Sequence, residues 1–235
     1  MITAQQIVSD ACTIAKAPGF TQLGGRQLNL VLDDLCQHRD LKMNRVQATI
    51  TLQIGSNGPF ALPGNYLRTY DLFYTVNNFP YMLYPMSQEQ YDGLFKDPSI
   101  ANYPYAYATD LSSTASYLST TAQVAGAIFI YPQSNSALSM THRYMIRRDA
   151  IAAPESSNVV PWFPDQDYLV HATAMRLMKF TDDSRYDKFV QDGENMLRTH
   201  IIEEGDEQKV VKEIKLDPQR FHLNRVIRPT KINPY

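Results

Sequence analysis

The sequence predicts an α+β fold in which a β-rich insertion interrupts a helical bundle. Apolar residues recur at helical spacing near both ends of the chain, whereas they alternate with polar residues between. Neither terminal helix pair can bury its apolar stripe alone, so we expect the pairs to pack together. The expected division is residues 1–41 and 155–204 for the helical bundle, 42–154 for an inserted antiparallel β-rich domain, and 205–235 for an extended C-terminal tail.

The first 41 residues predict a pair of helices. Thr3 is a suitable N-cap, and "APGF" ends the first helix at Pro18 and Gly19. We expect Gly24 and Gly25 to separate the two helices, because they lack the further glycines and the lysine of a phosphate-binding loop. The predicted stripes are Ile7, Val8, Ala11, Ile14 and Ala15 in the first helix, and Leu28, Val31, Leu32 and Leu35 in the second.

The period changes to two in the middle of the chain. "RVQATITLQI" predicts a strand that buries Val46, Ala48, Ile50, Leu52 and Ile54. "YLRTYDLFYTV" and "YMLYP" predict two further strands joined at "NN", and Ser87 with Gln90 forms a capping box for a short helix. "AIFIYP" and "ALSMTHRYMI" predict a hairpin around "QSNS". One face of its second strand carries Leu138, Met140, His142, Tyr144 and Ile146.

Helical spacing returns after "PWFPDQDYL", where Pro164 suits the start of a helix. The apolar pattern of the first late helix continues through Leu169, Ala172, Met175 or Arg176, and Phe180. "FTDDSR" predicts a turn, after which Ser184 opens the last helix. The apolar residues of that helix are Tyr186, Phe189, Val190, Met196, Leu197 and Ile201.

Composition excludes several classes of protein. The net charge of −2 gives no overall field to attract nucleic acid, which argues against a sequence-reading DNA binder. No apolar run approaches the roughly 20 residues of a membrane span, and the N-terminus does not resemble a signal peptide. Cys12 and Cys36 lie among helical apolar residues and are expected to be buried free thiols. We therefore expect a protein used inside a cell, or inside a particle assembled there.

No catalytic or metal-binding constellation stands out. The five histidines lack metal-site spacing, and His171 is expected to be an ordinary packed residue. The serine-rich segment "DLSSTASYLSTTAQ" lacks the G-x-S-x-G pattern of a nucleophile elbow. Neighbouring acids such as Asp33 and Asp34 point in different directions on a helix. The expectation is a protein with no cofactor, no metal and no enzymatic activity.

Tyrosine is concentrated between residues 61 and 99, in a stretch with few charges. Such a stretch suits a sugar site, a platform for nucleic-acid bases, or a protein interface. Platforms for bases usually carry interleaved lysine and arginine, which are scarce here. A tyrosine-rich, charge-poor surface is typical of protein interfaces. The candidate contact residues of such an interface are Tyr66, Tyr70, Tyr74, Tyr81 and Tyr84.

Four segments appear in an order that resembles the head-to-tail adaptor proteins of short-tailed bacteriophages, also called tail tubular protein A-like proteins. They are "ALPGNYLRTYDLFY", "YPMSQEQYDGLF", "IFIYPQSNSALSMTHRYMI" and "PWFPDQDYLVHATAMRLMKFTDDSRYDKF". The resemblance implies a ring of twelve copies that joins the portal to the tail nozzle in the virion. The ring would surround the genome during DNA ejection without reading its sequence, contact no membrane, and be assembled in the host cytoplasm.

The C-terminal segment mixes arginines with apolar residues, which predicts docking on the portal. A rival interpretation has these arginines touch DNA phosphates in the channel. Two other functions stay open at this point: a cell-wall or glycan hydrolase, and a glycan- or receptor-binding module of a virion. The candidate portal contacts are Arg220, Phe221, Leu223, Arg225, Val226, Ile227 and Arg228.

Overall fold

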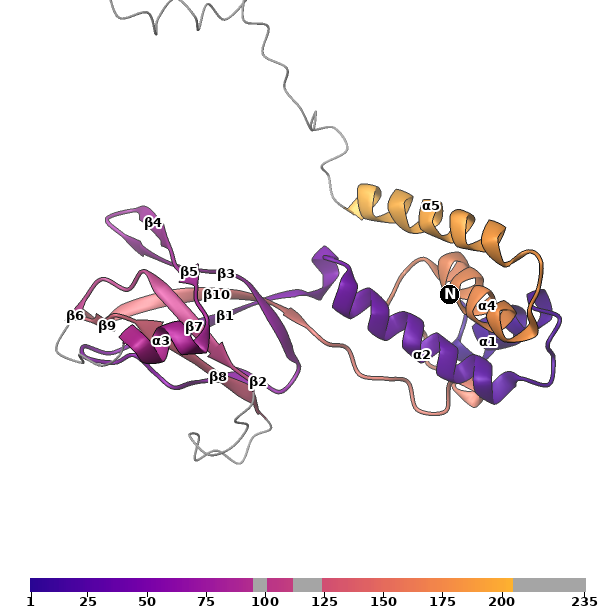
Figure 1. Cartoon of the computed structure of the whole chain (residues 1–235), viewed down its shortest axis with the longest axis horizontal. Coiled ribbons are helices and arrows are strands. Elements are labelled where there is room, and N and C mark those ends of the chain that lie inside the picture. Colours follow the sequence, from indigo (N-terminus) through magenta and orange to yellow (C-terminus); the bar gives the residue numbers. More distant parts are fainter. Residues whose placement is uncertain (95–100, 112–123, 205–235) are drawn as a thin grey trace, which may run out of the picture.

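The protein is described by a computed structural model that covers residues 1–94, 101–111 and 124–204. Its helices and strands form two lobes of an elongated molecule (Figure 1). The helical body consists of α1 (Ala4–Ile14), α2 (Thr21–His38), the short 3-10 helix η2 (Pro154–Ser156), α4 (Gln166–Thr181) and α5 (Tyr186–Glu204). α1 packs on α2 and α4, and α4 also packs on α2 and α5. The predicted packing of N- and C-terminal helices into one bundle is therefore confirmed.

The helical body has a continuous apolar core. Phe163, just before α4, is fully buried and contacts the rings of Trp162, Tyr168 and His200. Burying a side chain of this size contributes roughly 1.5–3 kcal/mol. Cys12 and Cys36 are buried free thiols, as predicted, and burial raises the pKa of both. Other fully buried members of the core are Ile7, Leu28, Leu35, Leu41 and Leu169.

Thr3 caps α1 as predicted. Its hydroxyl accepts a hydrogen bond from the Gln6 N–H, while the Gln6 side chain accepts one from the Thr3 N–H at 2.9 Å. This reciprocal pair satisfies two N–H groups that the first turn of the helix leaves open. The same arrangement of Ser87 and Gln90, at 3.0 and 3.2 Å, starts α3 (Gln88–Leu94) as the sequence predicts.

The prediction that the two glycines end one helix and start the next is wrong. α2 begins at Thr21, so Gly24 and Gly25 lie inside it. A Cβ atom at Gly24 would approach Val8 Cγ1 to 3.0 Å and Cys12 Sγ to 3.1 Å. The glycine therefore allows α1 and α2 to approach closely, and this packing gain offsets its low helix propensity.

The β-lobe holds two four-stranded sheets, a small two-stranded sheet and α3. The first sheet is antiparallel and has the order β1 (Arg45–Leu52), β10 (Leu138–Ile146), β3 (Tyr66–Val76) and β4 (Phe79–Met82). The second has the order β2 (Phe60–Pro63), β8 (Val124–Tyr131), β7 (Ala106–Asp110) and β5 (Tyr84–Pro85), with β5 parallel to β7. The small sheet pairs β6 (Ala101–Asn102) with β9 (Gln133–Ser134) in parallel, and η1 (Lys42–Asn44) precedes β1.

The core of the β-lobe lies between its two main sheets. Leu72 and Met140 from the first sheet, and Leu62, Ile128 and Ile130 from the second, are fully buried. The predicted inward face of β10 is confirmed, since Met140, His142, Tyr144 and Ile146 are buried and Leu138 is half-buried. Met145 is buried as well, because irregularities in the pairing of β10 with β3 interrupt the strict alternation.

Three predicted strand features differ from the structure. β8 and β10 do not form a hairpin: they belong to different sheets, and β9 lies between them in the chain. "YMLYP" is divided at Leu83, so β4 joins the first sheet and β5 the second. Finally, β2 lies where the sequence indicated only a turn followed directly by β3.

Two predicted core residues are exposed. Ile54 is 71% exposed, because β1 ends at Leu52 and a turn closes by a hydrogen bond from Ser56 N–H to the Gln53 carbonyl. Phe180 is 62% exposed in the last turn of α4. The predicted turn after it is confirmed, with Asp182 in the left-handed region at φ 51°, and α5 begins at Tyr186, two residues after Ser184.

Candidate protein-binding surfaces

An exposed, uncharged aromatic surface lies at one corner of the β-lobe. We call it the aromatic corner; it consists of Phe79, Tyr81, Met82, Tyr84, Tyr103 and Tyr105, each between 46% and 71% exposed. Met82 lies on the opposite face of β4 from Phe79 and Tyr81, so the corner includes both faces of this edge strand. β4 is an edge strand of its sheet and β5 an edge strand of the other. No charged residue occurs from Phe79 to Pro85. Exposed apolar clusters of this kind mark interaction sites on soluble proteins.

Tyr74 supports this corner from inside. Its ring stacks on Tyr81, with centroids 5.5 Å apart and an interplanar angle of 14°, and on Tyr103 at 6.4 Å and 11°. Its hydroxyl donates a hydrogen bond to the Pro104 carbonyl at 2.9 Å. Tyr74 itself is 2% exposed, and burial raises its pKa. The buried ring therefore fixes the orientation of the two exposed ones.

The five tyrosines predicted from the sequence fall into two groups. Tyr66 and Tyr74 are buried in the β-lobe, whereas Tyr70, Tyr81 and Tyr84 are exposed. The Arg45 guanidinium lies over the Tyr70 ring, with its central carbon 4.2 Å from the ring centroid. Tyr70 takes no part in the stacking of Tyr74 on Tyr81. Tyr66, Tyr70 and Tyr74 would share one face of a regular strand, but the pairing of β3 with β10 skips Tyr70, since Arg143 pairs with Asp71 and Tyr144 with Thr69. This bulge leaves Tyr70 exposed, while Tyr66 and Tyr74 stay buried.

Sequence reasoning missed four of the six residues of the aromatic corner: Phe79, Met82, Tyr103 and Tyr105. The signal that was available is the lack of charge in "FPYMLYP" and "YPYAYA". The proximity of these two segments depends on the pairing of β5 with β7, which no local pattern reveals. The candidate portal contacts lie outside the described residues: Arg220, Phe221, Leu223, Arg225, Val226, Ile227 and Arg228.

Polar contacts join the two lobes. Arg147 after β10 pairs with Asp33 of α2 at 2.9 Å, and Arg68 of β3 donates to the Gln37 carbonyl at 2.6 Å. The side chain of Asn29 exchanges two hydrogen bonds with the Ile151 backbone, at 2.9 and 3.0 Å. An open groove of about 630 Å³ lies beside Asp33 and Arg147. Met43 and Ile151 also pack against the core of the helical body, so the joint combines polar contacts with apolar ones.

His142 is a buried polar group in the β-lobe. It is 1% exposed, packs against the rings of Tyr66 and Tyr144, and its Nε2 lies 3.0 Å from Thr69 Oγ1. Burial lowers its pKa to about 4, opposed only in part by the Asp71 carboxylate. His142 is therefore neutral at pH 7, where it serves packing and hydrogen bonding.

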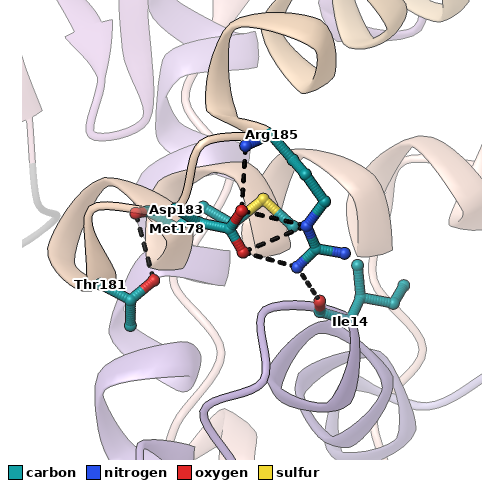
Figure 2. A network of polar contacts seen from close by, with 5 residues as sticks. All are labelled: Ile14, Met178, Thr181, Asp183 and Arg185. Carbon is teal, nitrogen blue, oxygen red and sulfur yellow. Dashed lines mark hydrogen bonds and ion pairs between the residues drawn. The ribbon is translucent and has the colours of Figure 1, made fainter.

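A further polar network closes the helical body (Figure 2). The Arg185 guanidinium donates hydrogen bonds of 2.6 to 3.1 Å to both oxygens of the Asp183 carboxylate. It also donates one to the Ile14 carbonyl at 2.9 Å. The guanidinium hydrogen bonds lower the pKa of Asp183 to about 2. The Ile14 carbonyl lies at the open C-terminal end of α1, where a positive charge is favourable. This network ties the start of α5 to the end of α1.

Few features of the described residues suggest a catalytic or metal-binding site. His171, predicted to be an ordinary packed residue, stacks on Phe189 with ring centroids 4.3 Å apart. Across residues 1–94, 101–111 and 124–204, no group of three or more His, Cys, Asp or Glu side chains is placed to hold a metal ion. Within the same ranges, none of the helices has the length and apolar character needed to cross a membrane.

Comparison with known protein families gives one result that covers both lobes. The family model described as SU10 adaptor protein matches residues 2–209. The match therefore includes the helical body, the β-lobe and the aromatic corner. No curated protein shows a significant match to the chain.

Proposed function

The chain belongs to the SU10 adaptor protein family of phage head-to-tail adaptors, and on this premise we propose that twelve copies form a ring between the portal and the tail nozzle. The ring surrounds the channel through which the genome passes, and it reads no DNA sequence. An adaptor of this family is a structural protein of the virion that binds other virion proteins, which is consistent with a non-enzymatic role. We propose assembly in the host cytoplasm and no contact with a membrane.

The observation that carries this proposal is the extent of the family match. Residues 2–209 include every described helix and strand, so the adaptor role belongs to the two-lobed molecule as a whole. A ring needs two different faces on each copy that fit each other head to tail. An elongated molecule with a helical body at one end and a β-lobe at the other has distinct surfaces for such contacts (Figure 1). We propose three functional units: the helical body of residues 1–41 and 155–204, the β-rich domain of residues 42–154, and the tail of residues 205–235.

We assign the aromatic corner to the nozzle or to a neighbouring copy. Tyr81 and Tyr84 are the members of the predicted tyrosine set that belong to this corner, and the buried Tyr74 supports them by stacking on Tyr81. Tyr70 is exposed elsewhere, beside Arg45, and the buried Tyr66 packs on His142 and Tyr144. Tyrosines supply wide apolar contact together with a polar hydroxyl, and they are enriched where binding energy concentrates. The lack of charge on β4 and β5 suits a surface that becomes fully desolvated.

We assign the C-terminal segment to the portal. Residues 220–228 contain Arg220, Arg225 and Arg228 among four apolar residues, without an acid. Apolar side chains can fill shallow pockets on a partner, while the arginines pair with carboxylates and fix the register. The family match ends at residue 209, so this assignment rests on the chemistry of the segment alone.

Light scattering tests the ring directly. The purified chain is measured alone and with the portal protein of the same phage, at equal protein concentration. We expect the portal to induce a complex whose mass fits twelve copies of a 26.8 kDa chain added to the portal. Absence of association at high concentration, with and without portal, contradicts the proposal.

A further inference from the structure

A groove of about 530 Å³ runs over α4, between α1 and α5. We call it the α4 groove. Its apolar lining comes from Ile14 of α1, Val170 of α4, and Phe189 and Met196 of α5. All four side chains are half-buried, so each still offers apolar surface to a ligand. The groove belongs to the helical body, whereas the aromatic corner belongs to the β-lobe.

Polar contacts hold the groove open at both ends. At one end the Ile2 N–H donates to Gln166 Oε1 at 2.7 Å. At the other, Arg185 ties the start of α5 to the Ile14 carbonyl (Figure 2). Along its length, His171 stacks flat on Phe189. The groove is therefore formed before any ligand arrives, which lowers the cost of binding.

The charge of the groove has one sign. Asp10 and Asp167 are the charged residues that line it, both are exposed, and no lysine or arginine joins them among the described residues. An apolar groove with two carboxylates at its rim selects a segment that combines apolar side chains with positive charge.

This chain carries such a segment in its own C-terminal region. "RFHLNRVIR", residues 220–228, has three arginines, four apolar residues and no acid. α5 ends at Glu204, about 12 Å along the helix from Met196 in the groove. Residues 205–219 can span up to about 50 Å when extended, and a flexible chain of that length averages roughly 20 Å. The segment can therefore reach the groove of the same molecule.

We propose that the α4 groove binds residues 220–228 of the same chain in the free subunit. Apolar side chains of the segment lie against Val170, Phe189 and Met196, and its arginines pair with Asp10 and Asp167. The tether raises the effective concentration to the millimolar range, so weak intrinsic affinity is sufficient. This segment is the one that we assign to the portal. In the free subunit it therefore occupies the α4 groove, and the portal competes with the groove for it. The groove site itself requires no portal.

Disulfide trapping in the full chain, without portal, tests the proposal. One variant carries Thr13→Cys in the groove and Asn224→Cys in the segment. The matched control carries Thr199→Cys with Asn224→Cys; Thr199 is exposed on α5 outside the groove and lies closer to the start of the tether. The native Cys12 and Cys36 are buried with raised pKa values, so they react slowly. Dilute protein is oxidised, and disulfides within and between chains are separated by mass.

We expect the groove pair to close within one chain about ten-fold faster than the control pair. Asp10→Asn with Asp167→Asn in the same background reduces this preference, and Asp10→Lys with Asp167→Lys abolishes it, while thermal unfolding shows that each variant is folded. Equal closure rates for the two pairs overturn the proposal, as does a preference that survives charge reversal. Disulfides found only between chains overturn the same-chain assignment. Each of these outcomes leaves the portal ring untouched, because no portal is present.

Discussion

Tyr81 lies flat on Tyr74, with ring centroids 5.5 Å apart, although the first ring is 49% exposed and the second only 2%. A buried tyrosine thus orients an exposed one at the corner of the β-lobe. The pair separates the two roles that a tyrosine-rich segment can have, since Tyr74 holds the fold and Tyr81 faces outward. This difference leads to opposite expectations for mutations at neighbouring positions.

Replacing exposed members of the aromatic corner should reduce binding without harming the fold. We expect Tyr81→Lys with Tyr84→Lys to weaken binding to the nozzle or to a neighbouring copy at least ten-fold, because buried interface lysines cost several kcal/mol. The midpoint of thermal unfolding should move little. Tyr74→Ala is the contrasting variant and should lower the free energy of unfolding by about 3–5 kcal/mol. Unchanged assembly by the double lysine variant would show that the aromatic corner has no partner in the particle.

The buried His142 predicts a specific pH dependence of stability. Its pKa is about 4 in the folded protein and 6.5 when unfolded, so the unfolded chain binds the additional proton between these values. The contribution of His142 to the free energy of unfolding is therefore fully present above pH 6.5. It falls as the pH drops toward 4, by about 3 kcal/mol in total. We expect urea unfolding of His142→Gln to lack this component. Parallel pH profiles of the two proteins from pH 7 to 4 would contradict the assignment.

Close packing of α1 on α2 can be tested at the glycines. Gly24→Val should destabilise by about 1–3 kcal/mol, since even a Cβ at Gly24 comes within 3.0 Å of Val8 Cγ1. Gly93 lies in α3, and a Cβ there meets no atom within 4 Å. Gly93→Ala should therefore be neutral or stabilise by up to about 1 kcal/mol. Chemical denaturation of both variants gives the comparison, and a tolerated Gly24→Val would argue against the tight helix contact.

Removing the C-terminal segment distinguishes between its two candidate partners, the portal and the DNA. A chain truncated after Gly205 should fail to bind DNA-free portal if residues 220–228 dock there. The rival interpretation predicts normal binding to empty portal together with leakage of packaged DNA, because the arginines would then act in the channel. Pull-down with empty portal and a nuclease-protection assay on filled particles distinguish these outcomes.

Local sequence patterns predicted most of the elements but not how they pair. Thr3 with Gln6 and Ser87 with Gln90 are short-range caps, and the alternation in β1 and β10 reports burial directly. The partner of β8 is a different matter. Its pairing with β2 and β7 is decided by contacts between segments distant in sequence, which a local turn signal cannot reveal. The same limitation hid Tyr103 and Tyr105 from the predicted interface.

Gly24 shows a second kind of limitation. A glycine pair between two apolar stripes is a normal helix boundary, and only the position of Val8 explains why α2 continues through it. The predicted tyrosine set was divided for a related reason. Tyr66 and Tyr74 lie on the buried face of β3, and which face is covered depends on the second sheet. Strict alternation would place Tyr70 on the same face, and the bulge in the pairing of β3 with β10 that leaves it exposed has no signal in the local sequence.

Negative-stain electron microscopy of the chain mixed with its portal shows whether the ring forms. We expect a closed ring of twelve copies seated coaxially on the portal, with a channel through its centre. Class averages that show bare portal, or isolated copies bound without contact to one another, would contradict it.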